Sequence, residues 1–297
     1  YLLDRARTAS AGFEKLDNYV DQVSQLEDLL LPEKGSLGDQ IANFFDSLRE
    51  VAAAPSELAP RAVAIEQGKT LAQGFNTYAQ RVDELKGGIK AVVSDSMTSV
   101  NMLSQQLADV NGRILATGQS GQSPNSIFDL RDRVINDLSK LIDLSIDYQD
   151  RGVASIRLGG SGVGPILVEG KTARSIDFEE TISGLQPVAL SSGDRRETNQ
   201  ITAGMVAGLS DAYTTANEVL KEVNQLALLM GREMNAQHRA GITLDGVRGD
   251  NIFSSNGITL VPGSANRADV TGELDILNPD ALPMGEMVAA SSAHADI

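Results

Sequence analysis

Apolar residues recur with a regular helical period over the long stretch from Pro60 to Ile114. Their spacing alternates between four and three residues, which is the a/d pattern of a heptad repeat, and it is held over roughly six heptads. A helix of ~55 residues would be ~80 Å long, whereas helices of globular domains usually have ~11–12 residues. The pattern therefore predicts one long helix with an apolar seam that the rest of the chain has to cover. The seam consists of Leu71, Phe75, Tyr78, Val82, Leu85, Ile89, Val92, Ser96, Val100, Leu103, Leu107, Val110 and Ile114.

The helical period returns in four other segments, at residues 1–31, 37–54, 127–141 and 208–238. The last of these is the expected partner of the long helix, because its apolar stripe is also long. The first segment is expected to turn one apolar stripe inward. That stripe consists of Leu16, Val20, Val23, Leu26 and Leu30.

Between residues 144 and 203 apolar and polar positions alternate in short runs separated by glycines, which predicts a small antiparallel β unit. The expected fold class is mainly α with an inserted β unit (α+β): an elongated, discontinuous helical rod domain plus a small antiparallel β domain. The rod would comprise residues 1–143 and 204–255, and the β domain would be inserted at 144–203. Residues 256–297 are expected to form a short strand-like segment and a C-terminal tail that leads to a missing terminal region.

Composition narrows the function classes. The chain has 40 acidic and 25 basic residues and a net charge of -15, and this acidic surface disfavours both nucleic acid and anionic lipid as partners. The absence of cysteine excludes disulfides, thiol catalysis and zinc–thiolate sites. No apolar run reaches the ~18 residues of a membrane span, and the first residues lack the features of a secretory signal.

The glycine-rich segments do not complete a phosphate-binding motif. Gly170-Lys171-Thr172 supplies the end of a phosphate loop, but the required first glycine falls on Pro165, which lacks a backbone donor. The run from Gly159 to Gly164 contains no dinucleotide-binding fingerprint. Both segments are therefore interpreted as turns between strands.

The two histidines, His238 and His294, lack any metal-binding spacing. His238 lies at the end of a predicted helix, where a capping or packing role is expected. The loop from Asp245 to Asn251 resembles part of a calcium loop but lacks the complete ligand register. We therefore expect no catalytic, cofactor-binding or metal-binding residues, no cofactor and no enzyme activity.

Several blocks of the sequence follow one another in a recognisable order: Phe44 to Leu48, Leu71 to Asn76, Leu107 to Ile114, Asn125 to Asp132, Gly152-Val153 with Leu167 to Gly170, Gly204 to Leu209, Val223 to Ala227, Met234 to His238 with Gly241, and Asp245 to Phe253. In this order they resemble the bacterial flagellar hook-associated protein 1 family, the first hook–filament junction protein. The resemblance covers about residues 2–255 and departs from the family pattern at Ser254, where the family has a second phenylalanine.

The resemblance implies a structural axial protein of the bacterial flagellum, an adaptor at the hook–filament junction that is needed for filament assembly. The implied neighbours are the flagellar hook protein and the second junction protein, and the full-length protein would self-associate in a ring. Because the family's heptad-rich terminal segments are missing, this fragment is expected to be monomeric. The implied location is extracellular, with export by the flagellar type III route and no cleaved signal peptide.

Two other function classes remain open from the sequence. One is a generic helical stalk or binding module of a surface-exposed protein, since long heptads occur widely. The other is an enzyme with a site in the β unit, which an ion coordinated by Asp245, Asp250 or His238 would favour. Apolar heptads at both ends of the full gene product would favour the junction protein.

Overall fold

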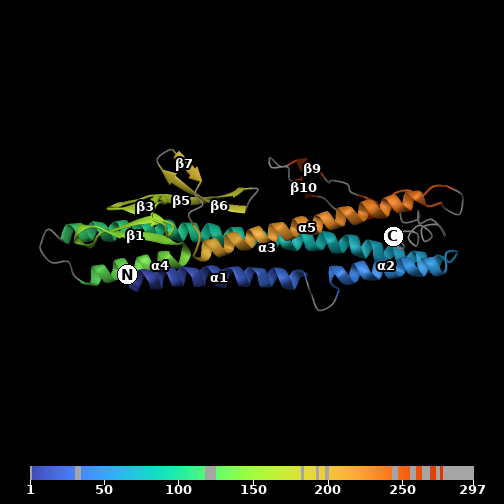
Figure 1. Cartoon of the computed structure of the whole chain (residues 1–297), viewed down its shortest axis with the longest axis horizontal. Helices are drawn as coiled ribbons and strands as arrows, with labels where there is room; N and C mark the ends of the chain where they lie inside the picture. The colour runs from blue at the N-terminus through green and yellow to red at the C-terminus, as the bar shows by residue number, and fades with distance from the viewer. Residues whose placement is uncertain are drawn as a thin grey trace. The chain divides into compact units, whose positions relative to one another are not determined.

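The computed structural model describes residues 2–30, 35–117, 125–181, 184–191, 194–197, 201–242, 247–254, 259–262, 268–271 and 275–276. Five long helices and several short antiparallel strands make up this part of the chain (Figure 1), so the predicted class, mainly α with an inserted β unit, is confirmed. The helices are α1 (Leu2–Leu30), α2 (Leu37–Ala53), α3 (Leu58–Thr117), α4 (Asn125–Leu141) and α5 (Met205–Ala240).

The strands between α4 and α5 form two small antiparallel sheets. The first has the order β1-β2-β3-β4, with Leu144 of β1 opposite Leu158 of β2. The second has the order β5-β6-β7. The strands of the two sheets are β1 (Leu144–Tyr148), β2 (Ala154–Leu158), β3 (Ile166–Glu169), β4 (Thr172–Ala173), β5 (Ser175–Thr181), β6 (Gly184–Ser191) and β7 (Asp194–Glu197), with a 3-10 turn at Asp150–Gly152.

The chain divides into two compact units, and α1, α3 and α5 each contribute to both. Unit 1 comprises Tyr1–Gln25 and Leu85–Asn217, and unit 2 comprises Leu26–Glu84 and Glu218–Ile297. The rod-and-insert boundaries expected from the sequence stay a prediction. Most of the expected C-terminal tail, 256–297, lies outside the described residues, apart from β9 (Thr259–Pro262), β10 (Ala268–Thr271) and β11 (Asp275–Ile276).

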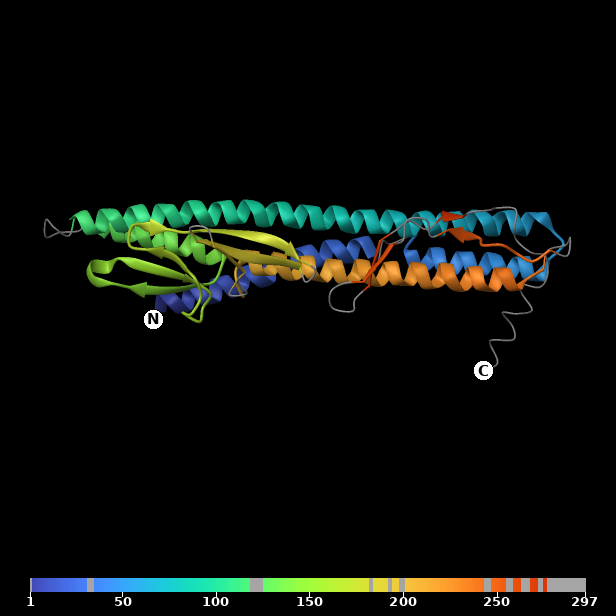
Figure 2. The same cartoon turned by 90° about the horizontal axis from the view of Figure 1, so that it is seen from above.

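The core of unit 1 joins helices to both sheets. Leu107 of α3, Leu138 of α4, Ile156 of β2 and Ile176 of β5 are almost fully buried in one cluster. Figure 2 shows the strands lying along α3 and α4, with α4 alongside the C-terminal part of α3. The alternating strand pattern found in the sequence therefore covers one side of the long helix.

The core of unit 2 is smaller and more aromatic. Phe44 of α2 packs edge-on against Phe253 of β8 (Phe253–Ser254), with ring centroids 5.9 Å apart. Leu71 and Phe75 of α3 and Ile252 complete the cluster. Helix α2 begins with a capping box in which Ser36 and Asp39 exchange backbone and side-chain hydrogen bonds, both 3.1 Å long.

The predicted seam of α3 is wrong at one position. Val92 is exposed, and Val93 is fully buried in its place. From Leu85 onward the inward positions advance by four, four and three residues, which makes an eleven-residue repeat. In a straight helix the face of a heptad repeat drifts ~20° around the axis every seven residues, and an eleven-residue repeat drifts less per residue. These inward positions are Leu85, Ile89, Val93, Ser96, Val100, Ser104 and Leu107.

The predicted inward face of α1 is also wrong over its first part. Leu16 and Val20 are exposed, whereas Arg7 and Ala11 are buried. The cause is the approach of α5, whose Gly208 lies directly against the backbone carbonyl of Lys15. Because Ala11 has a small side chain and Gly208 has none, α1 and α5 can approach this closely. The bulkier apolar residues of α1 therefore face outward in unit 1.

Candidate functional site

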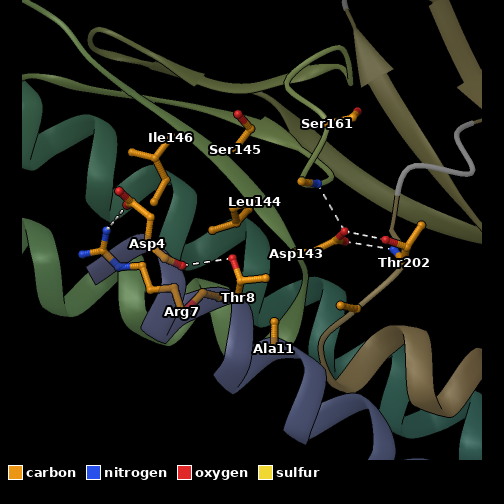
Figure 3. Close-up of a pocket in the computed structure, with 13 residues that line it drawn as sticks. Asp4, Arg7, Thr8, Ala11, Asp143, Leu144, Ser145, Ile146, Ser161 and Thr202 are labelled. Carbon is orange, nitrogen blue, oxygen red and sulfur yellow. Dashed lines mark hydrogen bonds and ion pairs between the residues drawn. The ribbon is translucent and has the colours of Figure 1, made fainter. Parts of the chain in front are cut away.

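The described part of unit 1 contains a pocket of about 580 Å³ between α1, the end of α4, the β2–β3 turn and the segment before α5 (Figure 3). Its polar lining includes Thr8, Asp143, Ser145, Ser161 and Thr202. None of these residues was singled out from the sequence. The pocket is therefore a candidate functional site.

Asp143 joins three segments at the edge of this pocket. Its carboxylate accepts hydrogen bonds from the Thr202 amide at 2.9 Å and the Thr202 hydroxyl at 2.7 Å, and a longer one from the Gly160 amide at 3.3 Å. Its backbone adds two contacts, donating to Ala203 at 3.1 Å and accepting from Gly159 at 3.0 Å. Asp143 thus fastens the end of α4 to a β turn and to the segment leading into α5.

Arg7 and Asp4 also line the pocket, and Arg7 is buried. Its guanidinium donates to Asn136 at 2.7 Å and to the Tyr148 hydroxyl at 3.1 Å. Asp4 and Asp132 lie 3.4 and 3.7 Å away and compensate its charge. A buried cation with two carboxylates beside it holds α1 against α4 and β1.

These contacts make the pocket a structural joint. Asp4 lies beside Arg7, and the Asp143 carboxylate is engaged by Thr202 and Gly160. The remaining polar side chains that line the pocket are hydroxyls. These contacts hold the elements around the pocket in place.

Two asparagines of α3 fix the sheets to the helix. Asn111 is fully buried, accepts a hydrogen bond from the Ala154 amide at 3.0 Å, and donates to the carbonyls of Ala154 at 2.8 Å and Gly170 at 3.0 Å. Asn101 makes the same kind of paired contact with the amide and carbonyl of Ile176, both at 2.9 Å. Each amide thus satisfies the backbone of a strand as a neighbouring strand would.

In unit 2, an asparagine of α5 makes the same kind of paired contact with the backbone of another segment. Asn235 accepts from the amides of Ile252 and Phe253, both at 2.9 Å, and donates to the Phe253 carbonyl at 2.7 Å. One turn further, His238 is fully buried, and its Nδ1 lies against the carbonyl of Asp250. Residues 250–253 therefore pack against the C-terminal part of α5.

The other residues that the sequence analysis considered as candidate binding sites lie at different places in the fold. Gly170 and Lys171 form the β3–β4 turn, where the Lys171 stem runs beside Gly112 of α3. The glycine run 159–164 is the β2–β3 connection. Asp245 and His294 lie outside the described residues, so the calcium-loop interpretation rests on the sequence alone.

A family model described as "Flagellar hook-associated protein FlgK helical domain" matches residues 23–253. The chain belongs to this family. A relative named flagellar hook-associated protein 1 from Salmonella typhimurium is 26% identical over 283 residues, covering 92% of this chain and 50% of the relative. The relative of that name from Bacillus subtilis is 24% identical over 299 residues, covering 91% and 58%.

A solved structure, the flagellar hook junction protein FlgK from Burkholderia pseudomallei, has the same fold. It superposes with a TM-score of 0.76 at 24% identity, covering 87% of this chain and 47% of that chain. The chain thus spans about half the length of the flagellar hook-associated relatives that it matches.

Within the described part of this FlgK helical domain, no group of three or more histidine, aspartate or glutamate side chains is placed to hold a metal ion. No described helix combines the length and the apolar character needed to span a membrane. The features that the FlgK helical domain does display are joints between helices and strands.

The contact of Glu180 with α3 and α5 is one such joint, and its stability is expected to depend on pH. Glu180 of β5 accepts hydrogen bonds from Lys90 of α3 at 2.6 Å and Tyr213 of α5 at 2.5 Å. These bonds, that from Lys90 first, hold the pKa of the Glu180 carboxyl below its usual value of 4.5. A lowered pKa means that the contribution to stability is present above the unfolded-state pKa and is lost as the pH falls through the folded-state pKa.

We therefore expect Glu180→Gln to reduce the stability difference between pH 6 and pH values below 4.5. The effect should stay below about 1 kcal/mol because the pair is half exposed. Urea unfolding at a series of pH values measures it. Glu179→Gln on the same strand is the matched control, and an equal effect of both changes would contradict the assignment to Glu180.

Proposed function

We propose that this chain is the core part of a structural axial protein of the bacterial flagellum, an adaptor at the hook–filament junction that filament assembly requires. The observation that carries the proposal is the match of the FlgK helical domain across residues 23–253. The printed names of the relatives, flagellar hook-associated protein 1, support the same role. A non-enzymatic function agrees with a pocket whose charged groups hold elements together.

The proposed neighbours are the flagellar hook protein and the second junction protein, with self-association in a ring in the full-length protein. The proposed location is extracellular, reached by the flagellar type III route. Export through a narrow channel requires an unfolded chain, and a chain without cysteine carries no disulfide that would have to be broken first.

Deletion of the gene in a motile parent tests the proposal. We expect bare hooks, release of unassembled filament subunits into the medium, and loss of swimming, because filament subunits would have nothing to polymerise on. Electron microscopy of the cells and analysis of the medium measure this result. A plasmid carrying the full gene should restore filaments, and normal filaments in the deletion strain would exclude the junction role in favour of a generic stalk.

A further inference from the structure

Helix α3 contains two adjacent glycines, Gly87 and Gly88, near the middle of its 60 residues. Glycine is the weakest helix former after proline, because its backbone loses the most conformational freedom when it becomes helical. Both glycines are exposed, and a Cβ at either position would meet no other atom of the described chain within 4 Å. Close packing within the described part of the chain therefore does not require a glycine at either position.

Other helical glycines of this chain do have a packing reason. A Cβ at Gly74 of α3 would overlap the side chain of Gln40 of α2, and a Cβ at Gly208 of α5 would overlap the Lys15 carbonyl. The pair at 87–88 differs from these glycines because its only effect on the described chain is to weaken the helix. Sharp bends in helices occur at proline, at glycine or serine pairs and at π-bulges, so this pair is a position at which α3 can bend.

The glycine pair lies beside the boundary between the two compact units. This boundary falls after Glu84 on α3 and after Asn217 on α5. On α5, the hydroxyls of Thr214 and Thr215 each donate to the carbonyl four residues earlier in the helix, at 3.0 and 3.1 Å. Such hydrogen bonds slightly destabilise helices and often bend them. Both α3 and α5 are therefore weakened close to the same boundary.

Lysines on either side of the glycine pair keep α3 attached to unit 1. Lys90 donates to Glu180 of β5 at 2.6 Å, and the Lys86 ammonium lies 5.3 Å from the centroid of the Tyr213 ring of α5. These contacts are made by the ends of long side chains, which can follow a small movement of the backbone. Ile89 is buried in the core of unit 1 and fixes α3 just after the pair. The contacts therefore limit a bend at the pair without preventing it.

We propose that Gly87 and Gly88 form a hinge in α3, at which the helical hydrogen bonds open locally and the part of α3 before the pair changes direction relative to the part after it. The inference is independent of the flagellar role. Hinges are commonly a few residues that absorb a change in φ and ψ, and two glycines without packing partners absorb it at low cost. The threonines allow α5 to follow the bend, and the lysine contacts restrict its amplitude.

Hydrogen exchange of single amides, measured by NMR on the 297-residue chain, tests the local opening. The helical hydrogen bonds of amides 87–92 span the glycine pair, so we expect their protection factors to be at least about tenfold lower than those of the α3 amides on either side. The double variant Gly87→Ala/Gly88→Ala should raise these protection factors about tenfold. Gly12→Ala on α1 is the matched control, because a Cβ there also meets nothing within 4 Å, and it should leave α3 unchanged. Uniform protection along α3 in the parent would overturn the proposal.

Residual dipolar couplings of the α3 amides distinguish a change of direction from local opening alone. The amides of a rigid helix align as one body, so residues 58–84 and 92–117 would then report the same degree of order. With a hinge between them, we expect the ratio of the smaller to the larger degree of order to fall below about 0.8 in the parent and to return to about 1 in the double alanine variant. Equal order in the parent, or an unequal ratio that persists in the variant, would contradict a hinge at Gly87 and Gly88.

Discussion

Asn111→Ala is expected to lower the free energy of unfolding by about 3–4 kcal/mol. The Asn111 side chain is fully buried and makes three hydrogen bonds to the backbone of Ala154 and Gly170. Truncation removes these bonds, leaves backbone groups in the core without their side-chain partner, and opens a cavity the size of an amide. The loss should therefore exceed that of a single hydrogen bond.

Urea unfolding followed by circular dichroism measures this effect. Asn101→Ala is the matched control, because Asn101 makes the same paired contact with Ile176 but is only partly buried. Water can replace part of that contact, so we expect a loss of about 1–2 kcal/mol at Asn101. Equal losses at the two positions would show that burial does not set the value of these amide contacts.

Gly208→Ala is expected to lower the free energy of unfolding by about 2–4 kcal/mol. A Cβ at Gly208 would lie 2.2 Å from the Lys15 carbonyl oxygen and 3.1 Å from the Lys15 Cα. These are backbone atoms of α1 and cannot rotate away, so α1 and α5 have to separate. The separation also strains the hydrogen bond from the Gly204 amide to the Ala11 carbonyl, which is 2.8 Å long.

Gly88→Ala on α3 provides a control with the opposite expected sign. Gly88 is exposed within the helix, and a Cβ there would have no neighbour within 4 Å. Alanine favours the helix over glycine, so this change should raise stability by about 0.5–1 kcal/mol. Thermal and urea unfolding of both variants give the comparison, and a stable Gly208→Ala protein would contradict the close helix approach.

Hydrophobic periodicity was sufficient to predict which segments are helices and strands. The long apolar pattern from Leu71 to Ile114 predicted α3, and the change to alternation after residue 144 predicted the sheets. Periodicity did not predict which face of α1 is buried. The sequence shows where apolar side chains gather along a helix, but α1 is positioned by a glycine and a buried arginine, so Leu16 and Val20 remain exposed.

Hydrophobic periodicity also did not predict the polar contacts between elements, for a different reason. Arg7, Asn111 and Asp143 act through partners that are distant in sequence, for example 129 residues between Arg7 and Asn136. The available signal was a polar residue four positions after an inward leucine of a helix, which applies to Asn111 after Leu107, although the predicted seam continued through Val110. Even that signal indicates a buried polar group without identifying the strand that it holds.

The clamp made by Asn111 also affects the chemical ageing of the chain. Asn111 is followed by Gly112, and an asparagine before glycine is prone to deamidation because the unhindered glycine amide attacks the side-chain carbonyl. In the fold, α3 commits the Gly112 amide to the helix, and three hydrogen bonds hold the Asn111 side chain away from it. Deamidation at this site is therefore confined to unfolded chains. A chain that is deamidated before folding would carry a carboxylate at a position that needs an amide donor.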